Sequence, residues 1–257
     1  MKTYSILSEK VGKIDPVSVE QYVQAGGFQA LKKALSMEPK EIAAEVRKAN
    51  LMGRGGAAYP TGLKWEQAIE VKGSPKYVVC NGDEGEPGTY KDKYILSGDP
   101  LMMIEGMIIG ARVVGAPKGV IYIRGEYRGV QKIVRTALEN AKRAGYLGKN
   151  IMGSGMDFEL EVTSGAGAYV CGENTALVES IEGKAGRPRM KPPYLKECGL
   201  YLKPTLLNNV ETFASIPFII KEGGEKYASI GFEGSGGTKL VSLAGNCLLY
   251  TSDAADE

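Results

Sequence analysis

The sequence predicts an α/β fold in which a mostly parallel sheet is covered by helices. Short β-prone runs alternate with helix-prone stretches along the chain, and glycine-rich polar segments follow two of these runs. Open α/β sheets bind ligands in the crevice beyond the carboxyl ends of their strands. We therefore expect these glycine-rich segments to contribute to a functional site.

The helix-prone stretches are, in chain order, residues 17–35, 39–50, 100–114, 129–144, 172–181 and 208–221. The best strand candidates are residues 77–80, 119–124, 158–163 and 239–244. Residues 101–116 are strongly apolar, but Glu105 and Arg112 interrupt them and the segment is too short to span a bilayer comfortably. We expect a buried helix there.

The most informative segment runs from Gly53 to Trp65 and contains four glycines, Arg54 and Lys64. Glycine permits positive φ and close backbone approach, and successive N–H groups can form an anion-binding nest to which two cations add attraction. Taken alone, such a segment is more often a surface turn. Two downstream segments favour a phosphate cradle instead.

The first downstream segment, residues 79–89, is an acidic, glycine-rich turn after the β-prone run at 77–80. The second, residues 164–175, connects a strand-like run to a predicted helix. Neither segment has the G-x-G-x-x-G spacing, and the chain contains no G-K-[ST] P-loop. The ordinary dinucleotide fingerprint and the P-loop are therefore excluded.

Composition indicates a soluble enzyme domain. The chain has 257 residues, is 43% hydrophobic and 24% charged, and carries a formal net charge of +2. This length suffices for one sizeable core, and a balanced charge without a basic run argues against a nucleic-acid partner. The N-terminus opens with no apolar signal segment. We expect a cytoplasmic protein that reaches a membrane only through a larger complex.

Some chemistries are excluded by the residues that the chain lacks. The sequence contains no histidine, which excludes Ser-His-Asp and Cys-His triads and histidine metal sites. The four cysteines, at positions 80, 171, 198 and 247, form no C-x-x-C pair. We therefore expect neither a zinc site nor an iron–sulfur site in this chain, and buried free thiols at Cys80 and Cys171.

The three segments, together with residues 188–194 and 208–212, resemble the FMN- and NADH-binding flavoprotein subunit of respiratory complex I. The family that they resemble also includes the diaphorase subunits of NAD(P)-linked hydrogenases and formate dehydrogenases. The resemblance runs from about Lys13 to Gly245. It implies a Rossmann-like FMN- and NAD(P)H-binding domain with a helical N-terminal region at residues 1–235, then the first strand of a ubiquitin-like domain at 236–246. Residues 247–257 depart from the family pattern, so we expect a C-terminal truncation and hypothesise a non-native tail.

The resemblance also implies the binding residues. The positions that match FMN contacts are Gly53, Gly55, Gly56, Lys64, Asn81, Asp83, Glu84, Gly172, Glu173, Asn208, Asn209 and Thr212. The positions that match the pyridine nucleotide are Ala57, Tyr59, Glu86, Tyr169, Asn174, Lys191 and Tyr194. No side chain is assigned as a general acid or base, since flavin N5 is the reactive centre. The sequence leaves open whether Arg54 contacts a ligand or forms a structural ion pair.

One departure from the family pattern bears on specificity. Asn174 stands where the family usually carries a second glutamate after Glu173, thought to accept hydrogen bonds from ribose hydroxyls. An amide removes the repulsion that a carboxylate would exert on a 2′-phosphate. We therefore hypothesise that NADPH is tolerated or preferred.

The resemblance implies an NAD(P)H dehydrogenase, or diaphorase, module. Hydride would move between the nicotinamide and FMN, and electrons would pass singly to iron–sulfur clusters. A [4Fe–4S] cluster is expected only in the missing C-terminal region. The implied partners are a [2Fe–2S] thioredoxin-like subunit and a larger iron–sulfur, hydrogenase or formate dehydrogenase subunit. Three alternatives stay open: a non-catalytic flavin-binding or assembly subunit, a flavin or nucleotide sensor, and a fragment that does not fold stably alone.

Overall fold

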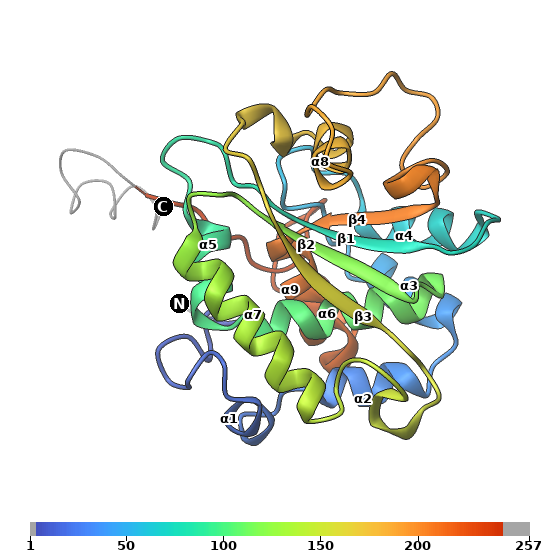
Figure 1. Ribbon diagram of the computed structural model, residues 1–257. Helices are drawn as coiled ribbons and strands as arrows, with labels where there is room; N and C mark the ends of the chain where they lie inside the picture. Colours follow the sequence, from blue (N-terminus) through green and yellow to red (C-terminus); the bar gives the residue numbers. More distant parts are fainter. Residues whose placement is uncertain (1–3, 244–257) are drawn as a thin grey trace.

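The computed structural model describes residues 4–243 and contains a four-stranded sheet with every strand parallel (Figure 1). The strand order is β3-β2-β1-β4. The strands are β1 (Tyr77–Gly82), β2 (Lys118–Ile123), β3 (Glu159–Ser164) and β4 (Thr205–Asn209). The predicted α/β fold with a parallel sheet is confirmed.

The helices precede, connect and follow the strands. They are α1 (Val19–Gln24), α2 (Gln29–Leu35), α3 (Pro39–Lys48), α4 (Thr61–Glu70), α5 (Lys91–Gly98), α6 (Pro100–Val114), α7 (Arg128–Arg143), α8 (Asn174–Ile181), α9 (Val210–Glu222) and α10 (Gly224–Ala228). Three short 3-10 turns complete the set: η1 (Ile151–Gly153), η2 (Tyr169–Gly172) and η3 (Leu200–Leu202).

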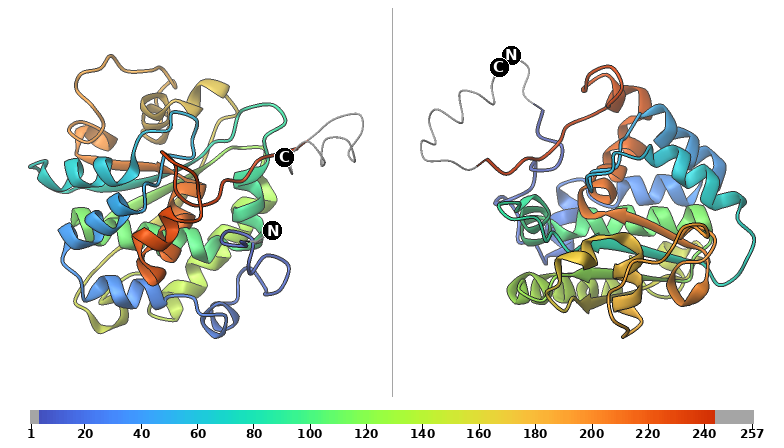
Figure 2. Two further views of the ribbon diagram at one scale, coloured as in Figure 1. Left: turned by 180° about the vertical axis from the view of Figure 1, so that it is seen from behind. Right: turned by 90° about the horizontal axis from the view of Figure 1, so that it is seen from above.

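Helices cover both faces of the sheet, as Figures 1 and 2 show. On one face α6 and α9 build the main core, and on the other α8 packs in a smaller core. Successive residues of β1 alternate between them, since Val78 and Cys80 belong to the main core and Val79 to the smaller one. A strand buried on both faces reads as a continuous apolar run, which explains why β1 could be recognised from the sequence.

Helix α6 is the predicted buried helix. Its start is fixed by Asp99, whose Oδ1 accepts a hydrogen bond from the Met102 amide at 3.2 Å, and by Pro100 in the first turn. Its end is fixed by Gly115, which adopts a φ of 68°. Every residue of the helix except Arg112 is buried, so α6 forms the centre of the main core. None of the helices that the structure describes is both long and apolar enough to cross a membrane.

The stretch at residues 17–35 is two helices and not one. The chain turns between α1 and α2, and Gly27 lies so close to Tyr22 that a Cβ on it would stand 2.1 Å from the ring. Glu105 of α6 fixes the second helix, because its carboxylate accepts from the amides of Phe28 at 3.0 Å and Leu31 at 2.9 Å. A contact from a distant helix therefore decides this break.

The prediction of a helix from residue 208 begins too early. Residues 205–209 are β4, which pairs with β1, and α9 begins at Val210 without an intervening loop. The side chain of Asn209 accepts from the Glu211 amide at 3.0 Å and caps the new helix. A five-residue strand that runs directly into an apolar helix leaves no turn signal in the sequence.

The strand predicted at residues 239–244 is wrong over its described part, because residues 239–243 have no regular structure. No neighbouring strand within residues 4–243 pairs with them. Residues 244–257, which include the proposed non-native tail, lie outside the described residues. The division into domains at residues 235 and 246 stays a prediction.

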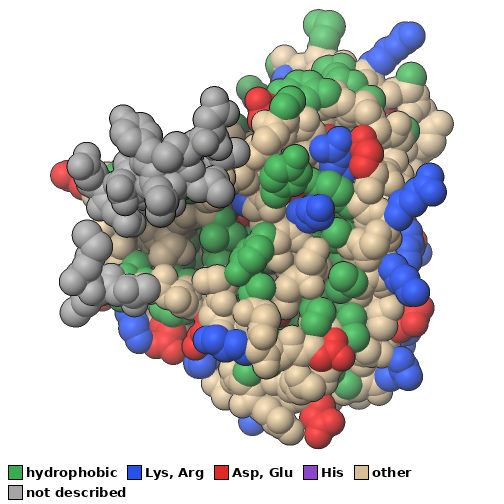
Figure 3. Space-filling view, turned by 90° about the vertical axis from the view of Figure 1, so that its left-hand side faces the viewer, with side chains coloured by type: hydrophobic (Ala, Val, Ile, Leu, Met, Phe, Trp, Pro, Cys, Tyr) green, Lys and Arg blue, Asp and Glu red, His purple; other side chains and the backbone are tan. Residues whose placement is uncertain are grey.

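Acidic and basic side chains are interspersed on the face that Figure 3 shows, and neither sign dominates it. This distribution agrees with the near-balanced formal charge of +2. Of the cysteines, Cys80 and Cys171 are buried and free, as predicted.

Candidate functional site

The carboxyl ends of the strands meet the three glycine-rich segments at one edge of the sheet. Residues 83–89 leave β1, residues 165–173 leave β3, and Asn209 ends β4 beside β1. The loop at residues 53–59 joins them from a distance in sequence: a Cβ on Gly55 would lie 3.2 Å from the Cβ of Asn209. The three glycine-rich segments therefore lie together at this edge of the sheet.

Two bonds shape the loop at residues 53–59. The Gly53 amide donates to the Tyr59 carbonyl at 3.0 Å, and the Arg54 amide donates to the Thr212 hydroxyl at 2.9 Å. Gly56 has a φ of 101°, and nothing lies within 4 Å of the position that a Cβ would take. The amides of Gly55 and Gly56 donate to no acceptor among the described residues. Free amides on an open glycine turn are what an anion-binding nest requires.

A cavity of about 740 Å³, here called the loop cavity, lies against this turn. It contains seven of the residues predicted to contact FMN and two predicted to contact the nucleotide, Glu86 and Tyr169. The seven are Gly55, Gly56, Asn81, Glu84, Gly172, Glu173 and Asn209.

The acidic turn after β1 is fixed by its own carboxylates. Glu84 has a φ of 41°, and its two carboxylate oxygens accept from the amides of Asp92 at 2.7 Å and Lys93 at 3.0 Å, at the start of α5. Asp83 is 2% exposed, and burial raises the pKa of its carboxyl to about 6. Asn81 accepts from the Asp83 amide at 3.1 Å. These contacts hold the turn in place beside the cavity.

A buried charge network, whose charged members were absent from the sequence-based site, lies beside the loop cavity, which Lys91 and Asp92 help to line. The Lys91 ammonium lies 2.7 Å from Asp92, 3.0 Å from Glu211 and 3.2 Å from the Asn209 side-chain oxygen. Burial disfavours the ammonium, but the two carboxylates outweigh it and raise the pKa of Lys91. The adjacent Lys91 and Asp92, just after the acidic turn, were the one signal that could have revealed this network.

Arg54 is mainly a structural contact. Its guanidinium donates to the Gly236 carbonyl at 2.8 Å, the Thr238 carbonyl at 3.0 Å and the Ser235 hydroxyl at 3.2 Å. Only 6% of the residue is exposed. Arg54 thus ties the glycine loop to a segment about 180 positions later in the chain.

The segment held by Arg54 continues along the loop cavity, which residues 239–242 help to line. The Leu240 amide donates to Glu211 at 2.9 Å, and the Ser242 hydroxyl accepts from the Tyr90 amide at 2.7 Å. Gly236 and Gly237 allow close packing, because a Cβ on them would lie 2.1 Å from the Ala49 oxygen and 1.9 Å from the Tyr227 ring. Gly236 and Gly237 are therefore tightly packed against the end of α3 and against α10.

A second cavity of about 510 Å³, here called the lysine cavity, contains five of the predicted nucleotide residues and Lys64. The five are Ala57, Tyr59, Asn174, Lys191 and Tyr194. Lys64 was predicted to contact FMN, and its ammonium donates to the Leu207 carbonyl at 3.0 Å. Burial lowers the pKa of Lys64 to about 8.

The two cavities adjoin at two points of the backbone. Gly56 lines the loop cavity and the next residue, Ala57, lines the lysine cavity. Likewise, Glu173 lines the loop cavity and Asn174 lines the lysine cavity. Glu173 caps α8 through the amides of Thr175 and Ala176, at 2.8 and 3.0 Å. The other carboxylate oxygen of Glu173 binds Lys191 at 2.7 Å.

Four of the predicted FMN residues line neither cavity. Gly53, Asp83 and Asn208 are each next in the chain to a lining residue, and Thr212 accepts a hydrogen bond from the amide of Arg54, which lines the loop cavity. The Oδ1 atom of Asn208 is buried and has no hydrogen-bond partner in the part of the chain that the structure describes. Asn174 accepts from the Asn81 side chain at 3.2 Å, which links the two cavities through a pair of amides.

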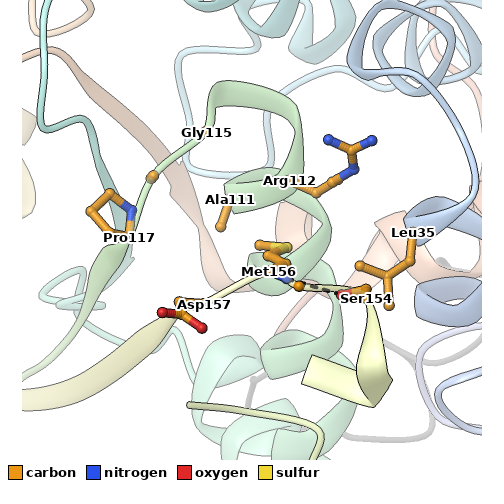
Figure 4. A pocket seen from close by; sticks show the side chains of 10 residues that line it. Leu35, Ala111, Arg112, Gly115, Pro117, Ser154, Met156 and Asp157 are labelled. Carbon is orange, nitrogen blue, oxygen red and sulfur yellow. Dashed lines mark hydrogen bonds between the residues drawn. The ribbon is translucent and has the colours of Figure 1, made fainter. Parts of the chain in front are cut away.

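A further cavity, of about 380 Å³, lies at the opposite end of the sheet, near the C-terminus of α6 and the start of β2 (Figure 4). Its charged side chains already have partners, since Arg112 donates to the Met37 carbonyl at 3.0 Å and Asp157 pairs with Lys149 at 2.6 Å. None of the predicted site residues lines it.

Known proteins with similar sequences identify the family. The model of the Nuo51 FMN-binding domain matches residues 46–218. The F subunit of the NADH-quinone oxidoreductase of Aquifex aeolicus is 52% identical, over 95% of this chain and 57% of that protein. The HndC subunit of the NADP-reducing hydrogenase of Solidesulfovibrio fructosivorans is 47% identical, over 95% of this chain and 50% of that protein.

Solved structures agree. In the crystal structure of an NAD⁺-reducing [NiFe]-hydrogenase in the H₂-reduced state, a chain superposes with a TM-score of 0.77 at 39% identity, covering 83% of this chain and 36% of that one. The present chain thus spans about half the length of the curated relatives and about a third of that chain. On these findings, the chain belongs to the Nuo51 FMN-binding domain family, and its cofactor is FMN.

Proposed function

We propose that this chain is the part of an NAD(P)H dehydrogenase module that binds FMN and the pyridine nucleotide. The observation that carries the proposal is the pair of adjoining cavities at the carboxyl edge of the sheet. Gly56 and Glu173 line the loop cavity, and the residues that follow them, Ala57 and Asn174, line the lysine cavity. Two flat cofactors in neighbouring cavities can be brought together for transfer between them.

The residues of the loop cavity fit FMN. The free amides of Gly55 and Gly56 suit its phosphate. The lone pairs that the Glu84 carboxylate keeps after accepting from the amides of Asp92 and Lys93 suit the ribityl hydroxyls. The unpartnered Oδ1 of Asn208 offers one further acceptor near the end of β4. FMN, when bound, supplies the chemistry that turns two-electron hydride transfer into single-electron steps. The protein groups bind and orient it.

The nucleotide would occupy the lysine cavity and extend toward Tyr169 and Glu86, which are joined by a 2.7 Å hydrogen bond. Tyr59 and Tyr194 are 42% and 53% exposed and can stack on flat rings. Asn174 presents an amide and no negative charge, so we infer that a 2′-phosphate is tolerated there and that NADPH is accepted as well as NADH.

The electrons would leave to iron–sulfur clusters outside the described residues. We infer a [4Fe–4S] cluster outside residues 4–243, a [2Fe–2S] thioredoxin-like partner subunit, and a larger iron–sulfur, hydrogenase or formate dehydrogenase subunit. These inferences rest on relatives that are named as subunits of an NADH-quinone oxidoreductase and of a hydrogenase.

The test is anaerobic reconstitution of the full chain with FMN, followed by addition of NADH and NADPH in parallel. We expect FMN to bind and its visible absorbance to bleach with both nucleotides. Bound FMN that neither nucleotide bleaches would contradict the dehydrogenase function and favour a binding subunit. A folded chain that does not retain FMN would contradict the cofactor assignment of the loop cavity.

A further inference from the structure

The charges of the lysine cavity have one sign. Lys64, Lys191 and Lys196 line it, and none of the aspartates and glutamates within residues 4–243 does. A cavity with three ammonium groups and no carboxylate on its wall attracts anions. The loop cavity differs, because its wall carries Glu84, Glu86, Asp92 and Glu173 beside its cations.

Two of these lysines are not neutralised by the protein. Lys64 donates only to the Leu207 carbonyl, at 3.0 Å, and Lys196 donates to the side-chain oxygen of Gln67, at 3.0 Å. Neither forms an ion pair with any residue in the described range 4–243. Lys191, by contrast, is paired with Glu173 at 2.7 Å. Lys64 and Lys196 are therefore the cations available to a ligand.

The surroundings of Lys196 are prearranged. Its ammonium lies 6.0 Å from the centre of the Tyr194 ring, and Gln67 holds it from the side of α4. The same oxygen of Gln67 accepts from the Tyr59 hydroxyl at 3.3 Å, while Lys64 lies 6.0 Å from the Tyr59 ring. Each of the two stacking tyrosines thus has a lysine beside it. A ring stacked on either tyrosine would therefore lie near an ammonium group.

We infer that Lys196, supported by Lys64, forms a subsite for the phosphate on the ribose of a phosphorylated adenosine. The inference rests on the proposed nucleotide-binding function and locates the group that would distinguish NADPH from NADH. It is independent of Asn174, because a lysine attracts the phosphate whereas the amide merely fails to repel it. The phosphate of FMN has its own cradle at Gly55 and Gly56, on the wall of the neighbouring cavity.

The experiment compares two probes that differ by one phosphate, adenosine 2′,5′-bisphosphate and adenosine 5′-monophosphate. Their binding to the full FMN-loaded chain is measured by titration calorimetry. We expect the bisphosphate to bind about tenfold more tightly, which corresponds to ~1.4 kcal/mol. In Lys196→Met the difference should fall to about twofold while 5′-monophosphate binding stays the same, and Lys196→Arg should retain most of it. Lys203→Met, an exposed lysine outside the cavity, is the matched control and should behave as wild type.

Wild-type protein that binds both probes equally, or a tenfold preference that survives Lys196→Met, would overturn the inference while leaving the nucleotide function intact. If Lys196→Met does not fold, as judged by circular dichroism, Lys196→Gln replaces it. Wild-type protein that binds neither probe and is not bleached by either nucleotide would overturn the proposed function as well. Flavin bleaching by NADH and NADPH without a bisphosphate preference would remove only the phosphate subsite.

Discussion

The loop cavity and the lysine cavity adjoin, but they differ in whether the protein pairs their cations with carboxylates. In the loop cavity, Lys91 is paired with Asp92 and Glu211, and Arg54 lies 4.0 Å from Glu211, so these two buried cations have carboxylate partners before any ligand binds. In the lysine cavity, Lys64 and Lys196 have only neutral partners. The fold itself therefore pairs the buried cations of one cavity, whereas in the other an anionic ligand would offset the burial of Lys64.

The largest effect is expected where the paired charges are broken. Lys91→Met should leave Asp92 and Glu211 without their cation in a buried site, which costs about 3–5 kcal/mol of unfolding free energy. The measurement is urea unfolding followed by circular dichroism, with Lys132→Met on the exposed face of α7 as the control. A loss below about 1 kcal/mol would mean that the network contributes little to stability.

The next effect concerns Arg54. Arg54→Met should remove its bonds to the carbonyls of Gly236 and Thr238 and lower stability by about 2 kcal/mol. Because Arg54 joins residues 235–238 to the glycine loop, FMN affinity should fall by about tenfold in a fluorescence titration. Arg112→Met, which also loses a bond to a carbonyl but lies at the opposite-end cavity, should leave FMN affinity unchanged. Unaltered FMN affinity in Arg54→Met would show that the loop keeps its shape without this anchor.

A pH effect is expected from Lys64. Burial holds its pKa at about 8 in the folded protein, below the usual value for lysine, so the unfolded chain binds more protons between these two values. Stability should therefore rise by about 1–2 kcal/mol as the pH increases from 8 to about 10.5. Lys64→Met should abolish this rise, which thermal unfolding over the pH range would measure. An identical pH profile in both proteins would assign the ammonium to solvent.

The smallest effect is expected at Asn174, and it tests how far this residue determines the preference between NADPH and NADH. Asn174→Glu should add repulsion against a 2′-phosphate and lower the NADPH/NADH ratio of kcat/KM by about fivefold, or ~1 kcal/mol. Anaerobic flavin reduction with each nucleotide measures the ratio, and Asn174→Gln serves as the neutral control. A ratio that Asn174→Glu does not change would leave the phosphate preference to Lys196 alone.

Much of the site was readable because its segments carry their own signals. Glycines at 53, 55 and 56, the acidic turn after β1 and the loop after β3 each have a composition that local chemistry explains, and the rule for open α/β sheets places them at one edge. The assignment of individual residues to FMN or nucleotide stays a prediction. The structure groups Lys64 with the predicted nucleotide residues, and Glu86 and Tyr169 with the predicted FMN residues.

The sequence by itself determined the α/β class, the buried helix α6 and the glycine-rich edge of the site, because these depend on apolar runs and backbone freedom that each segment carries locally. Only the tertiary structure decided the break between α1 and α2, the strand β4, and the pairing of Lys91 with Glu211. Glu105, β1 and Glu211 act there from distant parts of the chain. Such partners leave no trace in a local pattern, since a carboxylate reads the same whether it will be solvated or buried against a cation.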